Sequence, residues 1–210
     1  MLNIRLSRTI PSRSYKKLSR EFYERPTLQV AKDLLGKYVV YHHADGKLSA
    51  RIVEVEAYVG ENDPACHAAR GKTKRNSVMF GPGGYAYVYF VYGMHHCLNF
   101  VTEVESKPAA VLLRAAEPQE GLEIMQFNSP GKKELELLNG PGRLCRSFGL
   151  SKEHTGLDLT QDTLYLENRE KSKIRIERTT RVGINVGTDK LWRFYDKESS
   201  AVSARRSVRD

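Results

Sequence analysis

Five runs of apolar and aromatic residues, each bounded by turn residues, constrain the fold of this chain more than any other feature. They occupy residues 38–43, 48–60, 85–92, 95–104 and 109–118. The clearest of them alternate with period two, as strands that bury one face do. The turn residues ADGK join the first two runs, and a tight turn at YGM joins the next two. The pattern predicts hairpins of a mainly antiparallel sheet.

Helical patterns lie before and after these strands. Residues 19–36 begin with a capping serine, carry Pro26 at a helix start and end at Gly36. Shorter helical patterns and further strands follow, the helices at 119–128 and 143–148 and the strands near 163–168, 173–184 and 192–196. Hairpins mixed with helices predict an α+β fold, and a length of 210 residues without repeat or linker favours a single domain.

The charge balance indicates a partner that carries phosphate. Thirty-four Lys and Arg against 25 Asp and Glu give a formal charge of +9. An acidic small molecule or an anionic membrane would fit the same balance. The three cysteines are too few and too far apart for a disulfide framework or a Cys-x-x-Cys metal site. With no apolar run of about 20 residues and no secretory signal, we expect a soluble, intracellular protein without a membrane partner.

The ends of the chain differ in composition from the middle. Residues 1–18 are rich in Arg, Lys and Ser and contain no acid, and residues 204–210 are also basic. We expect a flexible basic N-terminal arm over 1–18, a folded domain over 19–203 and a basic tail over 204–210. The alternative for the first segment is an organelle transit peptide, which has a similar composition.

The strand RIVEVEAYVG places acidic side chains on one face. Strict alternation sends Val53, Val55, Ala57 and Val59 to a core face, and Ile52, Glu54, Glu56 and Tyr58 to the other. An ordinary solvated face is one interpretation of the second set. However, the strand ends where a long basic loop over 61–84 begins, and this loop carries His67. A carboxylate, a phenol and an imidazole at one strand end are a plausible pocket wall.

The next hairpin is unusually rich in tyrosine. Alternation predicts Tyr85, Tyr87 and Tyr89 on one face, and Ala86, Val88, Phe90 and Tyr92 on the core face. Tyr92 stands at the bend, where a large side chain either packs back on a neighbouring loop or projects into water. A projecting aromatic suits insertion between base steps of DNA. Tyr87 and Tyr89 could form a stacking pocket for a base.

Several sequence blocks, taken in order, resemble one protein family. The blocks are RIVEVEAYVG, DPACHA, KRNSVMF, YVYFVYGMHHCLN, VLLRAAEP, GPGRLC and RVGI followed by WRFY. They are similar to the alkyladenine (3-methyladenine) DNA glycosylase family over about residues 19–203. The resemblance implies a curved antiparallel sheet with surrounding helices and a protruding hairpin. It also implies hydrolysis of the bond between a damaged purine and deoxyribose, with no metal, no cofactor and no lyase step.

The resemblance also assigns roles to residues. It implies that Glu56 activates water, that Arg114 holds the water and the carboxylate, and that Tyr92 enters the minor groove to fill the gap left by a flipped nucleotide. The flipped base, which can be an alkylated or a deaminated purine, is expected among Tyr58, His67 and Tyr89, with Asn99 as a steric filter against an exocyclic amino group. The residues expected along the DNA-contacting surface are Arg75, Met79 and Arg143.

Other expectations follow from the same resemblance. The partner is expected to be double-stranded DNA that contains damaged purines, and we expect the protein to be a monomer. It acts in the cytoplasm or nucleoid of a bacterium, or in the nucleus or an organelle of a eukaryote. The chain departs from the family pattern at Ala68, where a serine is common, and at His95 and His96. These two histidines point to opposite faces of a strand, so we interpret them as structural or DNA-facing rather than as metal ligands.

Two alternatives remain. A nucleic-acid-binding module without catalysis would use the same scaffold but would have no need for Glu56, Tyr58, His67 and Arg114 together. A hydrolase of small nucleosides would leave Tyr92 and the basic surface without a purpose.

Overall fold

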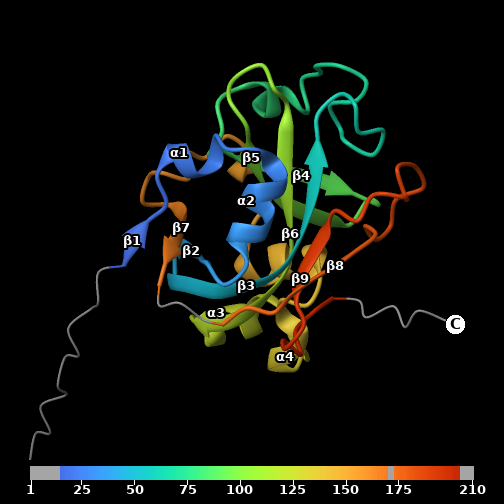
Figure 1. Cartoon of the computed structure of the whole chain (residues 1–210). Helices are drawn as coiled ribbons and strands as arrows, with labels where there is room; N and C mark the ends of the chain where they lie inside the picture. The colour runs from blue at the N-terminus through green and yellow to red at the C-terminus, as the bar shows by residue number, and fades with distance from the viewer. Residues whose placement is uncertain (1–14, 170–172, 204–210) are drawn as a thin grey trace, which may run out of the picture.

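The computed structural model describes residues 15–169 and 173–203. Within these residues nine strands form one sheet, and every pairing between them is antiparallel. Helices pack around this sheet, and the β4–β5 hairpin extends from one end of it (Figure 1). The predicted α+β fold on a curved, mainly antiparallel sheet is confirmed.

The centre of the sheet is formed by the longest strands. The order β1-β7-β2-β3-β6-β5-β4 places β3 and β6 side by side, while β9 pairs with β3 and β8 with β9. The strands are β1 Lys16–Lys17, β2 Tyr38–His43, β3 Gly46–Val59, β4 Ala86–Val91, β5 His95–Thr102, β6 Ala109–Glu120, β7 Leu164–Asn168, β8 Ile176–Thr179 and β9 Arg193–Asp196. The residues of β6 are buried from Ala109 to Ala116, and all of them except Arg114 are apolar, as expected of a strand covered on both faces.

The helices of the described residues are short, with four to eight residues each. They are α1 Arg20–Tyr23, α2 Thr27–Leu34, α3 Leu122–Asn128, α4 Glu134–Leu137 and α5 Pro141–Phe148, with 3₁₀ turns η1 Ser77–Phe80 and η2 Lys152–His154. The helix start predicted at Pro26 is confirmed, since Pro26 directly precedes α2, and the residues after Ser19 form the separate short helix α1. Pro26 disfavours helical backbone in the residue before it, so the chain breaks into α1 and α2. The structure begins α3 at Leu122 rather than at 119, because β6 continues to Glu120.

The main core lies between the sheet and the helices. It includes Val30 and Leu34 of α2, Val55 and Leu113 of the central strands, and Phe148 of α5, all essentially inaccessible to water. In Figure 1, α2 crosses the sheet near its middle, while α3 and α4 lie together at one end. The opposite side of the central strands is left for a second cluster of buried residues.

The chain ends only partly match the expected boundaries. Lys16 and Lys17 pair with β7, and Leu18 is buried, so the last residues of the expected arm belong to the sheet. The remainder of that arm, residues 1–14, and the expected basic tail, residues 204–210, lie outside the described residues.

Candidate active site

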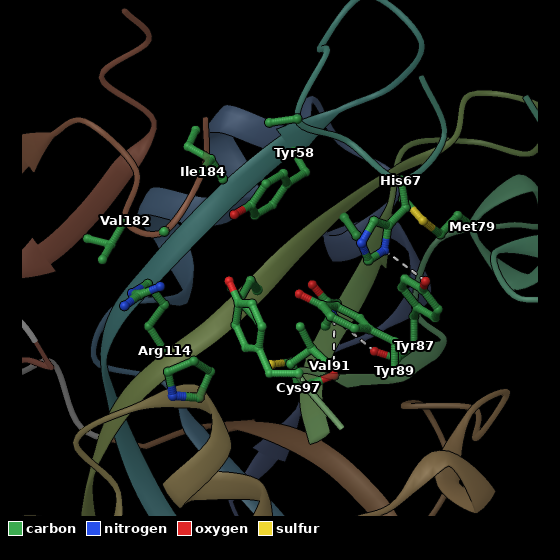
Figure 2. A pocket seen from close by; sticks show the side chains of 17 residues that line it. Tyr58, His67, Met79, Tyr87, Tyr89, Val91, Cys97, Arg114, Val182 and Ile184 are labelled. Carbon is green, nitrogen blue, oxygen red and sulfur yellow. Dashed lines mark hydrogen bonds between the residues drawn. The ribbon is translucent and has the colours of Figure 1, made fainter. Parts of the chain in front are cut away.

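A cavity of about 360 Å³ opens over the second face of the central strands. It is within the range of about 300–1,000 Å³ that is typical of small-molecule sites. Strands β3, β4, β5 and β6 supply its floor, and the segment 182–184 closes one side (Figure 2). Every residue predicted to bind the base lines this cavity: Tyr58, His67, Tyr89 and Asn99.

The Glu56 carboxylate lies directly beneath the cavity wall. Its Oε2 accepts a hydrogen bond from the Tyr58 hydroxyl at 2.9 Å, and its Oε1 accepts from the Val182 backbone N–H at 2.7 Å. The Nη1 atom of Arg114 lies 3.3 Å from Oε1. All three partners line the cavity, whereas Glu56 itself is fully buried. A carboxylate offers about four lone-pair sites, and only two of these contacts are hydrogen bonds, so Glu56 can accept a further one.

Burial has the largest effect on the pKa of Glu56. It raises the pKa of this carboxyl above its ordinary value, although Arg114, the Val182 N–H and the Tyr58 hydroxyl all act in the opposite direction. The result is a carboxylate that is a better base than one in water. Tyr58, which shares the hydrogen bond, has a raised pKa for the same reason and stays protonated.

The second carboxylate of the strand, Glu54, is also fully buried, so the solvated-face interpretation is wrong. Its Oε1 accepts from Arg114 Nε at 2.9 Å and from Arg193 Nε at 2.7 Å. Ser203 donates to it twice, from its hydroxyl to Oε1 at 2.9 Å and from its backbone N–H to Oε2 at 2.5 Å. Burial alone would raise the pKa of Glu54, but the two arginines and Ser203 bring it below its usual range.

Two β-bulges create this arrangement. The register of β3 against β6 passes over Val53 in one strand and over Arg114 in the other. As a result Ile52 joins Val55 in the main core, whereas Val53 packs in a separate small cluster. Strict alternation had placed Ile52 and Val53 the other way round, and that prediction is wrong. Bulges commonly re-aim a side chain next to a functional site, and here Arg114 meets both Glu54 and Glu56.

Four rings form the aromatic part of the cavity. His67 Nδ1 lies 2.9 Å from the Tyr87 hydroxyl, and the centroid of the His67 ring lies 4.5 Å from that of Tyr89, edge to face. Tyr58 stands apart from these three, across the pocket (Figure 2). The buried Asn76 amide donates to the His67 carbonyl at 2.9 Å and so fixes the loop that carries the imidazole. Tyr87 and Tyr89 therefore line one aromatic cavity, as expected.

His67 is neutral over the physiological pH range. Burial, with a smaller contribution from the positive charge of Arg75, lowers the pKa of His67 to about 4. Arg75 is itself placed with its guanidinium carbon 5.3 Å from the centre of the Tyr89 ring. The arginine predicted to lie along a DNA-contacting surface thus also supports one wall of the cavity.

Asn99 and Met79 are buried in the wall of the cavity. Asn99 is 4% exposed, and its amide nitrogen donates to the carbonyls of Tyr87 at 3.0 Å and Cys97 at 3.3 Å. Met79, at 2% exposure, lies in the cavity wall and not along an open surface. The expected place of Met79 is therefore corrected, because η1 turns its side chain into the second hydrophobic cluster.

The hairpin tip projects from the molecule. Tyr92 is 77% exposed and has a positive φ of 53°, and its neighbours Phe90 and Met94 are also exposed. The alternative in which Tyr92 packs back on a neighbouring loop is wrong. The ring still borders the cavity entrance. Arg143, which follows the start of α5, is exposed and donates from Nη1 to Asn139 Oδ1 at 2.6 Å.

Sequence analysis missed the pair that holds the loop beside Glu56. Arg181 and Asp63 are joined by two hydrogen bonds, at 2.5 and 2.8 Å, and their side chains are completely buried. The guanidinium carbon of Arg181 lies 4.7 Å from the centre of the Tyr58 ring. This pair fixes the backbone N–H of Val182 on Glu56. Residues 173–184 were predicted as a strand, but β8 ends at Thr179 and the following residues turn inward.

The remaining sequence-based expectations concern metal ligands, the two histidines of β5 and membrane spans. In the part of the chain that the structure describes, no group of three His, Cys, Asp or Glu side chains is placed to hold a metal ion. His95 and His96 lie at the start of β5, exposed and half-buried respectively. No helix of the described ranges is long and apolar enough to span a bilayer.

Comparison with known proteins agrees with this geometry. The sequence profile of a family described as methylpurine-DNA glycosylase matches residues 21–200. A protein of Methanocella arvoryzae, named as a candidate 3-methyladenine DNA glycosylase, is 51% identical over 193 residues, which cover 90% of this chain and 96% of that protein. A protein of Carboxydothermus hydrogenoformans with the same name is 50% identical over 190 residues, covering 90% and 99% of the two chains.

Proposed function

Because the chain belongs to the methylpurine-DNA glycosylase family, we propose that it flips an alkylated purine out of duplex DNA and hydrolyses its N-glycosidic bond. Its membership of this family shows that the protein is a DNA glycosylase that acts on alkylated bases in repair, as the resemblance predicted. Flipping, the roles of single residues, activity on deaminated purines and the absence of a lyase step belong to the proposal. The observation that carries it is the buried Glu56 carboxylate beneath a base-sized aromatic cavity.

The cavity suits a positively charged base. A purine methylated at N3 or N7 carries positive charge and is attracted to the faces of electron-rich rings. Tyr58 and Tyr89 supply such rings, and their raised pKa values keep the hydroxyls protonated. His67 stays neutral because its pKa is about 4, so it does not repel a cation. The Asn99 amide, held by two hydrogen bonds, would act as a steric filter against the exocyclic 2-amino group of unmodified guanine, whose neutral ring gains no cation attraction from the cavity.

Hydrolysis of the N-glycosidic bond chiefly requires a general base that deprotonates water. Glu56 accepts a proton from water as the water oxygen forms a bond to C1′ and the bond from C1′ to the purine nitrogen breaks. The bonding electrons neutralise the cationic ring, so the leaving purine needs no added proton. The raised pKa of Glu56 favours this proton transfer. Water takes the place of an enzyme nucleophile, so the product is an intact strand with an abasic site.

The surrounding surface would hold the substrate. Tyr92 is placed to enter the duplex where the nucleotide has left, at a cost of about a few kcal/mol per unstacked step. Arg75 and Arg143 are exposed and would contact phosphates, and the net charge of +9 favours salt-sensitive, sequence-independent binding. Two expectations stay predictions: the monomeric state and a location where the cell keeps its DNA.

The experiment is an excision assay on duplexes that contain 3-methyladenine, 7-methylguanine or hypoxanthine. We expect release of the free base and strand cleavage only after alkali, which would separate hydrolysis from a lyase reaction. Glu56→Gln should lose about 10²–10⁴-fold in rate. Glu120→Gln, at the far end of β6, is the control and should retain activity. Tight duplex binding by the wild type without release of any base would favour the binding-module alternative.

A further inference from the structure

Glu54 is a buried charge that the proposed reaction does not use directly. Its side chain is inaccessible to water, and four donor groups from Arg114, Arg193 and Ser203 surround it. Arg193 comes from β9 and Ser203 from the end of the described chain, 139 and 149 residues away from Glu54 in sequence. A buried ion needs such partners because its desolvation is costly.

The Arg114 guanidinium is divided unequally between the two carboxylates of β3. Its Nε donates to Glu54 at 2.9 Å, and its Nη2 donates to the Ser203 hydroxyl, which itself donates to Glu54. Only Nη1 approaches Glu56, at 3.3 Å. An arginine prefers a fork of two parallel bonds to one carboxylate. With Nε on Glu54 and Nη2 on Ser203, Arg114 makes no such fork with Glu56.

We propose that Glu54 is a positioning residue that, with Ser203, holds the Arg114 guanidinium away from a two-bond pairing with Glu56 and so leaves Glu56 able to accept a proton from water. This inference rests on the proposed function, in which Glu56 is the base. It explains why a strand that needs one carboxylate carries two. It also gives the last described residues of the chain a part in the catalytic centre.

Removal of the Glu54 charge would change Glu56 in one direction. Arg114 would be free to pair with Glu56, and the nearby negative charge would disappear, and both effects lower the pKa of Glu56. The pH dependence of the excision rate then reports the pKa of Glu56, which several neighbouring groups influence. The charged and titratable groups that face Glu56 are Glu54 and Tyr58 on β3, Tyr89 on β4, Cys97 on β5, Arg114 on β6 and Arg181 in the segment after β8.

The test is the single-turnover excision rate of alkylated duplex DNA as a function of pH. For Glu54→Gln we expect the acid limb to move to lower pH, and the plateau rate to fall on the order of tenfold because the base is weaker. Ser203→Ala should produce a smaller shift of the same sign, and Ser203→Thr, which keeps a hydroxyl, should restore the wild-type profile. Ser199→Ala is the matched control, since Ser199 lies in the same segment but donates to Glu117.

The outcomes separate this inference from the proposed function. If the wild type releases no base, the proposed function fails. If the wild type is active but the Glu54→Gln profile keeps its acid limb or moves it to higher pH, the inference is overturned. Should Glu54→Gln fail to fold, Ser203→Ala decides: a profile identical to that of Ser199→Ala contradicts the positioning role.

Discussion

Replacement of Tyr92 tests the proposal that the hairpin tip serves DNA and not the fold. Tyr92 is 77% exposed, so folding removes only a quarter of its surface from water. A tyrosine can bury about 150–250 Å², which leaves roughly 50 Å² to be lost in Tyr92→Ala. At about 25 cal/mol per Å² this corresponds to about 1 kcal/mol of unfolding free energy at most.

The backbone conformation at Tyr92 makes the expected loss of unfolding free energy smaller for Tyr92→Gly than for Tyr92→Ala. The φ of 53° lies in the left-handed region, which costs a residue with a side chain roughly 1–2 kcal/mol. Tyr92→Gly relieves this strain while it removes the same ring. We therefore expect its unfolding free energy to lie within about 1 kcal/mol of the wild type.

DNA binding should change by much more. Stacking of a base on an aromatic ring contributes about 1–3 kcal/mol, which corresponds to roughly 5- to 150-fold in Kd. Urea unfolding measures the first quantity. Fluorescence anisotropy with a duplex that holds an abasic site measures the second without any reaction. Phe127→Ala is the control, because Phe127 is 84% exposed on α3, away from the cavity.

Two results would refute the reasoning. A loss of more than about 2 kcal/mol of unfolding free energy in Tyr92→Gly would show that the ring supports the fold, contrary to its exposure. Unchanged affinity of both Tyr92 variants for the abasic duplex would show that the ring does not enter DNA.

Three further predictions concern the cavity. Glu56→Gln should raise the unfolding free energy at pH 8 on the order of 1 kcal/mol, because burial raises the pKa of Glu56 and its ionised form disfavours folding. This gain should vanish at acid pH, where the carboxyl is protonated in both the folded and the unfolded state. A Glu56→Gln variant that is less stable than the wild type at pH 8 would contradict the prediction. Asn99→Ala should increase excision of guanine on the order of tenfold or more relative to the wild type, and unchanged selectivity would remove the filter role. The ring of His67, with a pKa of about 4, should show no titration between pH 5 and 8 by NMR, whereas a midpoint above 6 would mean that the imidazole is not buried as described.

The sequence was most informative where a residue's environment comes from its own strand and hairpin. Alternation along β4 correctly placed Ala86 and Val88 in the main core and Tyr87 among the rings of the cavity. The same alternation put Phe90 and Tyr92 on the core face, and that part is wrong: they are 48% and 77% exposed, because a short turn leaves a large side chain little to pack against. The proximity of Glu56, Tyr58 and His67 was also predicted, since the loop after β3 begins where the strand ends.

The residue environments that the sequence did not predict are formed by segments that lie far apart in the chain. Glu54 and Glu56 looked solvated because alternation says nothing of Val182 and Ser203, which cover them from more than 120 residues away. Bulges at Val53 and Arg114 carry no glycine that would have indicated them. The inward turn after β8 depends on the buried pair of Arg181 with Asp63, a contact across 118 residues.

The most direct test of the central claim is the crystal structure of Glu56→Gln bound to a duplex that holds an alkylated purine. The account predicts the purine in the cavity between Tyr58 and His67, with its C1′ facing residue 56 and Tyr92 inserted in the gap. A base that remains stacked in the duplex, with Tyr92 outside it, would contradict the account.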